Sequence, residues 1–165
     1  MTLSESYISN ITSQISDIPD PEVPVITIAD LGILREVREE NGRFIVTITP
    51  TYSGCPAMRA IENEIGEVFK NNSVNNFEIR YVFSPAWTTD WMNENAREKL
   101  RKYGIAPPEK TTSDKSVLFV HAKTKLCPRC SSSNTEMISA FGSTACKALY
   151  RCKNCGEPFD YFKCH

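Results

Sequence analysis

Residues 127–155 of this 165-residue chain read CPRCSSSNTEMISAFGSTACKALYRCKNC, with a Cys-x-x-Cys turn at each end and 21 residues between the turns. A Cys-x-x-Cys turn lets two thiolates reach one metal ion, and two such turns close a tetrahedral shell of four sulfurs. The stretch between them predicts a hairpin of short strands at 137–141 and 148–151. A module of about fifty residues has too small a core to fold alone, so a bound metal would supply its folding energy. The pattern predicts a zinc ribbon whose ligands are Cys127, Cys130, Cys152 and Cys155.

Sulfur ligation by itself leaves the identity of the metal open, because four thiolates also bind rubredoxin-type iron or an iron–sulfur cluster. A thioredoxin-like redox pair is disfavoured, since no βαβ pattern surrounds the cysteines. Two further cysteines lie in this region, Cys146 in the apparent turn GSTACK and Cys164 after the aromatic stretch FDYF. Cys146 could be a small buried residue and Cys164 an incidental thiol, or both could be additional metal ligands.

The composition is that of a soluble globular protein, with 41% hydrophobic and 24% charged residues and no apolar run long enough to span a membrane. The N-terminus, MTLSESYISN, lacks the basic and apolar regions of a secretory signal, so we expect a cytoplasmic protein with no membrane partner. Seven cysteines in that setting favour metal binding or redox chemistry over disulfides. Residues 115–165 carry 8 Lys and Arg against 3 Asp and Glu, but a tetrathiolate zinc centre would offset two positive charges. Nucleic-acid binding is therefore disfavoured.

Upstream of the cysteine region, hydrophobic periodicity alternates between helical and strand spacing. Asn41-Gly42 predicts a two-residue hairpin, Pro56 can start a helix, and Gly104 can end one. In chain order the predicted elements are a helix over about 3–18, strands over 33–38 and 43–50, a helix from Pro56, a strand over 77–83 and a helix over about 91–103. The predicted fold class is α+β, with a two-layer α-β-β-α-β-α domain at 1–106, a linker at 107–116 and a small zinc-ribbon β module at 117–165. Residues 117–123 could form a short strand.

The seventh cysteine, Cys55, lies alone between the predicted strand at 43–50 and the helix that begins at Pro56. Unpaired N–H groups and the helix dipole at such a position favour a thiolate, which suits a metal-cluster ligand or a reactive nucleophile. Protease-like chemistry is disfavoured, because His121 and His165 are both distant in sequence. The local pattern alone favours a helix-capping cysteine without chemistry.

Three carboxylates and two tryptophans could also serve either structure or a site. Asp20, Glu22 and Asp30 lie in turns bounded by proline or glycine, where carboxylates commonly cap the turn. A mixed oxygen and sulfur metal site would need them close to a thiolate, which sequence distance does not reveal. Trp87 and Trp91 are expected to be core or helix-capping residues.

Several of these segments together resemble known families. DPEVPVITIADLGIL followed by TPTYSGCP resembles the small iron–sulfur assembly domain of bacterial SufT-type proteins and of the eukaryotic cytosolic iron–sulfur targeting complex. SPAWTTDWM and FGSTACKALYRCKNCGEPFDYFKCH resemble the PaaD-type (also PaaJ-type) accessory proteins of the bacterial phenylacetyl-CoA epoxidase system. The resemblance runs from about Ile18 to the C-terminus and departs in 107–126, where some relatives carry extra Cys or His and this chain has only His121.

The resemblance implies a function for the lone cysteine. Asp20, Glu22, Asp30 and Thr51 match family positions around a functional cysteine associated with iron–sulfur delivery, and Cys55 matches that cysteine. It implies an accessory maturation factor rather than an enzyme, with zinc in the ribbon and a transient iron–sulfur cluster at Cys55. Cys146 and Cys164 match two further family cysteines. The implied partner is the reductase or the diiron oxygenase of the epoxidase, and a homodimer is an open option. The alternative is a structural or regulatory zinc-binding subunit of the oxygenase without cluster transfer.

Overall fold

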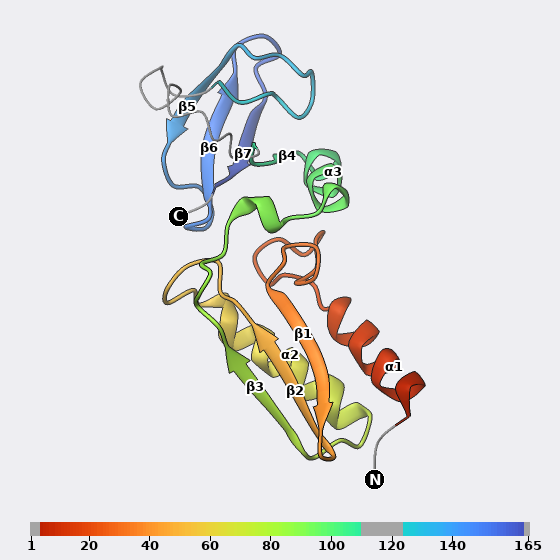
Figure 1. Ribbon diagram of the computed structural model, residues 1–165. Helices are drawn as coiled ribbons and strands as arrows, with labels where there is room; N and C mark the ends of the chain where they lie inside the picture. Colours follow the sequence, from red (N-terminus) through yellow and green to blue (C-terminus); the bar gives the residue numbers. More distant parts are fainter. Residues whose placement is uncertain (1–3, 110–123, 164–165) are drawn as a thin grey trace. The chain divides into compact units, whose positions relative to one another are not determined.

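The computed structural model describes residues 4–109 and 124–163 (Figure 1). The chain divides into two compact units, Met1–Asn93 and Glu94–His165. This division differs from the predicted boundary at residue 106, because strand β4 (Ile105–Ala106) pairs with β7 (Pro158–Phe162) in the sheet of the second unit. Residues 110–116 of the predicted linker, and the predicted strand at 117–123, lie outside the described residues.

The first unit contains the predicted α-β-β-α-β order. Its elements are α1 (Glu5–Ser16), β1 (Leu34–Glu40), β2 (Arg43–Ile48), α2 (Ala57–Asn71), β3 (Phe77–Tyr81) and the 3₁₀ turn η1 (Thr89–Trp91). The sheet order is β1-β2-β3, with β1 and β2 antiparallel and β2 and β3 parallel. Asn41 and Gly42 have φ values of 53° and 79°, as a type I′ hairpin turn requires.

Both helices of the first unit bury one apolar stripe. Ile11 and Ile15 of α1 are buried, and the Ser4 side chain caps its first turn by accepting from the Tyr7 N–H. The buried stripe of α2 ends at Phe69, whose ring lies 5.3 Å from Phe44 on β2 and 4.5 Å from Phe77 on β3. Figure 1 shows α2 lying across one face of the sheet. The predicted α+β fold class is confirmed, with the two-layer sheet and helices in the first unit and the last predicted helix, α3 (Glu94–Tyr103), in the second.

The parallel pairing of β2 and β3 determines where the loop with Cys55 lies. A parallel pair needs a crossover, here α2, and the carboxyl ends of both strands meet at one edge of the sheet. Ile48 ends β2 opposite Tyr81 at the end of β3, and the Val82 N–H donates to the Ile48 carbonyl at 2.9 Å. The loop from Thr49 to Pro56 therefore leaves the sheet beside the end of β3.

The turn at Asp30-Leu31-Gly32 packs against both tryptophans. The Trp87 indole N–H donates to the Leu31 carbonyl at 2.7 Å, and Trp87 is buried, as predicted for a core residue. Gly32 has φ of 75°, and a Cβ there would lie 2.9 Å from both Cβ and the carbonyl oxygen of Trp91. Both its conformation and the close approach of Trp91 therefore require glycine.

We expect Gly32→Ala to lower the free energy of unfolding of the first unit by about 2–4 kcal/mol, since alanine adds both a positive-φ cost and an overlap with Trp91. Gly42→Ala is the matched control, because Gly42 has φ of 79° but no other atom lies within 4 Å of the position that an alanine Cβ would occupy. Its expected cost is about 1–2 kcal/mol. Urea unfolding followed by tryptophan fluorescence measures both, because both tryptophans belong to this unit. If both substitutions lower the unfolding free energy equally, the overlap with Trp91 does not add to the cost at Gly32.

The second unit contains α3 (Glu94–Tyr103), β4, β5 (Thr135–Ser139), β6 (Lys147–Cys152) and β7. The sheet order is β4-β7-β6-β5, so the predicted hairpin is present as β5 and β6. The predicted start of the last helix near Trp91 is wrong, because Met92 is extended (ψ 131°) and separates η1 from α3. Gly104, with φ of 93°, follows the end of α3 as expected.

Candidate metal centre and the Cys55 loop

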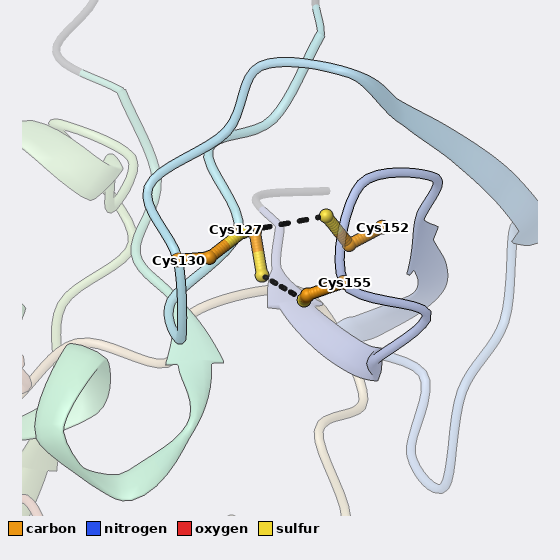
Figure 2. Close-up of side chains that lie close together, drawn as sticks. All are labelled: Cys127, Cys130, Cys152 and Cys155. Atoms are coloured by element: carbon orange, nitrogen blue, oxygen red, sulfur yellow. Dashed lines mark hydrogen bonds between the residues drawn. The ribbon is translucent and has the colours of Figure 1, made fainter.

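The two Cys-x-x-Cys turns bring four sulfur atoms together. The Sγ atoms of Cys127 and Cys155 are 3.8 Å apart and those of Cys130 and Cys152 are 3.6 Å apart (Figure 2). All four lie within 4.8 Å of one another. A tetrahedral site with metal–sulfur bonds of about 2.3 Å separates its sulfurs by about 3.8 Å. The four sulfurs therefore fit one metal ion.

Each turn is held by the same backbone hydrogen bond. The Ser131 N–H donates to the Cys127 carbonyl at 2.9 Å, and the Gly156 N–H donates to the Cys152 carbonyl at 2.9 Å. Both donors have left-handed φ values, 60° for Ser131 and 78° for Gly156. The two turns are thus conformationally equivalent, as expected of paired knuckles around one ion.

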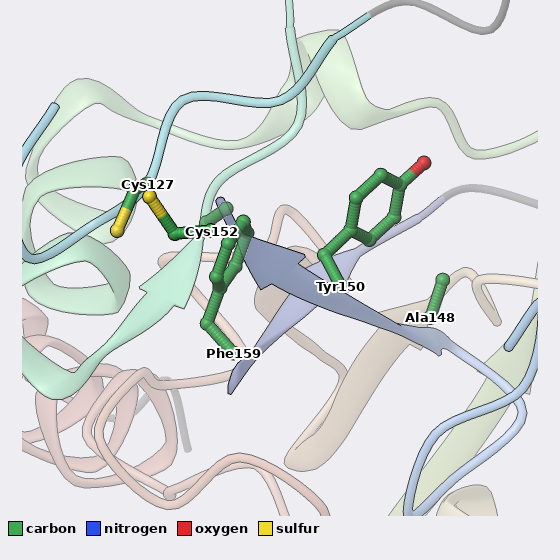
Figure 3. Packing of buried hydrophobic residues seen from close by; sticks show 6 residues of the cluster. Cys127, Ala148, Tyr150, Cys152 and Phe159 are labelled. Atoms are coloured by element: carbon green, nitrogen blue, oxygen red, sulfur yellow. The ribbon is translucent and has the colours of Figure 1, made fainter. Parts of the chain in front are cut away.

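One cysteine of each turn lies in the apolar core of the second unit. Cys127 and Cys152 are buried in a cluster with alanine and aromatic side chains (Figure 3). Cys130 and Cys155 are exposed. The other members of the cluster are Ala106, Ala148, Tyr150 and Phe159, with Tyr161 against it. The metal centre therefore joins the core to the surface, and β4 contributes to that core through Ala106.

The backbone and the neighbouring sulfurs set the proton affinities of these thiols. The N–H groups of Cys155 and Asn154 donate to the Cys152 sulfur and lower the pKa of Cys152 to about 6. The N–H of Glu157 favours the Cys155 thiolate, but partial loss of hydration and the three other sulfurs raise the pKa of Cys155 to about 12. The lowered pKa favours a thiolate at Cys152 at neutral pH, whereas Cys155 must lose its proton before it can bind a cation.

Cys146 is too far along β6 to join this centre. It directly precedes β6, which ends at Cys152, and six residues of extended strand span about 20 Å. Cys146 is buried, and its sulfur lies 3.1 Å from the Thr144 hydroxyl. Cys164, the other additional ligand that the sequence suggested, lies outside the described residues.

Cys55 is half-buried in the loop from β2 to α2, immediately before Pro56. Its N–H donates to the Tyr52 carbonyl at 3.3 Å, and its carbonyl accepts from the Met58 N–H at 3.2 Å. The thiol therefore lies at the amino end of α2. Thr51 is half-buried in the same loop.

Sequence reasoning missed two polar residues near this thiol, Glu62 on α2 and Tyr81 on β3. The Tyr81 hydroxyl is hydrogen-bonded to the Glu62 carboxylate, and its ring stacks on Phe83 with centroids 6.0 Å apart. Burial, the Glu62 carboxylate and the Cys55 thiolate raise the pKa of Tyr81 to about 12. Glu62 lies seven residues after Cys55, about two helical turns, so this spacing was the available signal.

We expect Tyr81 to make the stability of the first unit depend on alkaline pH. Because the folded pKa of about 12 exceeds the ordinary value of 10.0, its contribution is complete below pH 10 and is lost as pH rises toward 12. Tyr81→Phe should therefore flatten the fall in unfolding free energy across that window, measured by urea unfolding at several pH values. Tyr103→Phe, at an exposed tyrosine of the second unit, is the control. If the unfolding free energy of Tyr81→Phe falls between pH 10 and 12 as steeply as that of the wild type, Tyr81 is not the source of this pH dependence.

Two of the three predicted supporting carboxylates, Asp20 and Asp30, act as turn caps, and Glu22 contributes its backbone N–H to the first of these caps. Asp20 is buried, and its Oδ1 accepts from the N–H groups of Glu22 at 3.0 Å and Val23 at 2.8 Å. Asp30 is buried, and its two oxygens accept from the Thr27 N–H and from the Asn93 side-chain amide. These contacts match the local interpretation of Asp20 and Asp30. A role for them beside Cys55 stays a prediction.

Comparison with known proteins covers both units. Residues 111–163 match the family model described as PaaD zinc beta ribbon domain, and residues 8–72 match that described as iron-sulfur cluster assembly protein. Over 164 residues the chain is 47% identical to an Escherichia coli (strain K12) protein provisionally named as one of the subunits of 1,2-phenylacetyl-CoA epoxidase, covering 99% of this chain and 96% of that protein. The chain belongs to the PaaD family. The resemblance found in the sequence is confirmed.

The first part of this PaaD-family chain has further relatives. It is 31% identical over 97 residues to the Bacillus subtilis (strain 168) Fe-S protein maturation auxiliary factor YitW, covering 58% of this chain and 94% of that protein. A crystal structure of a domain of unknown function from Bacillus anthracis is similar, with a TM-score of 0.52, 28% identity, and coverage of 58% of this chain and 92% of that one. The assembly-protein match includes Cys55 and the ribbon match includes the four-cysteine centre.

None of the helices within 4–109 and 124–163 combines the length and apolar character that a membrane span requires.

Proposed function

We propose that this chain is an accessory maturation factor of the phenylacetyl-CoA epoxidase system and not an enzyme. It would assist the assembly or delivery of an iron–sulfur cluster, most naturally to the reductase component, with the diiron oxygenase as the other candidate recipient. The observation that carries the proposal is the position of Cys55. It is a partly accessible thiol at a helix amino end, within the part of the chain that matches an iron–sulfur assembly family. The name of the Escherichia coli relative supports the link to the epoxidase, and cytoplasmic action fits an intracellular recipient.

The proposed chemistry at Cys55 is ligand exchange. The cluster is cargo: one of its irons binds the Cys55 thiolate as an earlier ligand leaves, and a recipient cysteine later replaces Cys55. Cys55 is only partly buried at the amino end of α2, so its sulfur is accessible to an incoming cluster. Asp20, Glu22 and Asp30 shape the preceding turns through their backbone contacts, and Thr51 belongs to the loop that presents the thiol.

We assign the resident metal of the second unit as zinc, bound by Cys127, Cys130, Cys152 and Cys155. The four-sulfur donor set and its spacing fit zinc, which here would supply folding energy. Cys130 and Cys155 are exposed, so the centre lies at a surface that a recipient could contact. The ribbon would thus orient a partner protein while the first unit handles the cluster.

Metal and acid-labile sulfide analysis, with a visible spectrum, tests this function on protein purified without oxygen. Wild type should contain zinc together with iron and sulfide, and Cys55→Ser should contain the zinc alone. The alternative, a structural zinc-binding subunit, is supported by the burial of Cys127 and Cys152 in the apolar core of the second unit, since a metal bound there would stabilise the fold. It predicts zinc, no iron and no colour in both proteins, and stable co-purification with the oxygenase.

A further inference from the structure

The four-cysteine centre exposes half of its ligand residues. Cys130 and Cys155, the second cysteine of each turn, are exposed. Cys127 and Cys152, the first cysteine of each turn, are only 1% and 0% exposed and pack in the apolar cluster of the second unit. Each turn therefore contributes one exposed cysteine and one buried cysteine. A reagent dissolved in water should meet Cys130 and Cys155 first.

The two exposed cysteines are also close enough to bond to each other. All four Sγ atoms lie within 4.8 Å of one another, so the Cys130 and Cys155 sulfurs need to approach by at most about 3 Å to reach a disulfide length of about 2.05 Å. Two other pairs have shorter Sγ separations, Cys130–Cys152 at 3.6 Å and Cys127–Cys155 at 3.8 Å. Each of these pairs includes a cysteine of the apolar cluster, which would have to leave its packed neighbours to form the bond. A bond between the exposed pair leaves both buried cysteines in the core.

Zinc binding would keep these sulfurs in their reactive form. A cysteine that binds zinc does so as a thiolate, and the thiolate, not the thiol, is the nucleophile that reacts with oxidants. A disulfide carries no negative charge and is a poor zinc ligand, so a bond between two of the four sulfurs removes half of the metal's coordination shell. Because the metal would supply folding energy to the ribbon, the second unit should then lose its fold.

We propose that Cys130 and Cys155 are a site of oxidative modification, at which a peroxide converts the two thiolates to a disulfide and the ribbon releases its zinc. One thiolate attacks a peroxide oxygen, the O–O bond breaks, and a sulfenic acid and hydroxide form. The second thiolate then displaces hydroxide from the oxidised sulfur as the S–S bond forms. The two sulfurs together lose two electrons, the peroxide gains them, and two protons from solvent convert both hydroxides to water. The inference rests on the proposed function only for the assignment of zinc.

Oxidation of the full-length, zinc-loaded protein with hydrogen peroxide tests the proposal. Peroxide is added at less than about one equivalent per chain, so that the first thiols to react are identified before the ribbon unfolds. A chromogenic chelator measures the released zinc, and alkylation followed by peptide mass spectrometry identifies each oxidised cysteine. We expect about one zinc ion for each disulfide, a disulfide that joins Cys130 and Cys155, and reduced Cys127 and Cys152. A thiol reductant with added zinc should restore zinc binding.

Two variants accompany the wild type. Cys130→His retains a zinc ligand but cannot form the disulfide, so its zinc should be released at least about tenfold more slowly at the same peroxide concentration. Cys146→Ser is the matched control, since it removes a buried thiol of the same unit that is not one of the four sulfurs. It should change neither the rate of zinc release nor the disulfide that forms.

The proposal is overturned if the first disulfide includes Cys127 or Cys152, if zinc stays bound after the disulfide has formed, or if Cys130→His releases zinc at the wild-type rate. If Cys130→His binds no zinc, the cysteines oxidised in the wild type decide the question. Metal analysis before oxidation separates this proposal from the proposed function. Iron in place of zinc at the four sulfurs contradicts the assignment of the metal, whereas the identity of the oxidised pair still supports or overturns the role of Cys130 and Cys155.

Discussion

Cys152→Ser should release the metal and unfold the second unit. Cys152 is fully buried at the junction of β6 and the second turn, where its sulfur both binds the ion and packs in the apolar cluster. The cluster is small, and metal binding at structural four-ligand sites contributes about 10–16 kcal/mol of folding free energy. Metal analysis should find no zinc, and the amide spectrum of the second unit should collapse while that of the first persists, because the first unit has its own core.

Cys146→Ser is the matched control for this loss. It removes a buried thiol from the opposite end of β6, away from the four sulfurs, and should leave zinc content unchanged. Wild type treated with a strong chelator should reproduce the behaviour of Cys152→Ser. Full zinc content and an intact second unit in Cys152→Ser would rule out the four-sulfur centre as the source of its folding energy.

Cys55→Ser should leave both units folded and abolish support of epoxidase activity in cells lacking the wild-type chain. Serine is nearly isosteric with cysteine, and the backbone contacts of this residue do not involve its side chain. Its hydroxyl, however, does not ionise at neutral pH and is a poor ligand for iron. Epoxidase activity should fall to that of cells without the chain, with the ribbon zinc retained.

Ser53→Ala is the control in the same loop, because Ser53 is exposed and two residues from Cys55. It should support wild-type activity. Equal, full activity in Cys55→Ser and Ser53→Ala would reject a role for the thiol and favour the structural-subunit alternative.

The elements that were predictable from sequence depend on short-range chemistry. Asn41-Gly42 encodes its own turn, the apolar stripe of α2 recurs within the helix, and each Cys-x-x-Cys turn closes on itself through one backbone hydrogen bond. β4 was missed because a two-residue strand has no periodicity, and it exists only through pairing with β7. Because β4 pairs with β7, β4 and the helix α3 before it belong to the second unit. That unit therefore begins at Glu94 and not after residue 106, as the sequence predicted.

By itself the sequence determined the fold class, the four-sulfur donor set and the position of Cys55 at a helix amino end, since each follows from residue types at close spacing. Only the tertiary structure decided which groups surround those sites. The parallel register of β2 and β3 brings Tyr81 and Glu62 near the Cys55 loop, and the length of β6 separates Cys146 from the metal centre. The end of α3 meets the first turn through residues more than twenty positions apart. Such contacts depend on the packing of whole elements, which no local pattern of residues records.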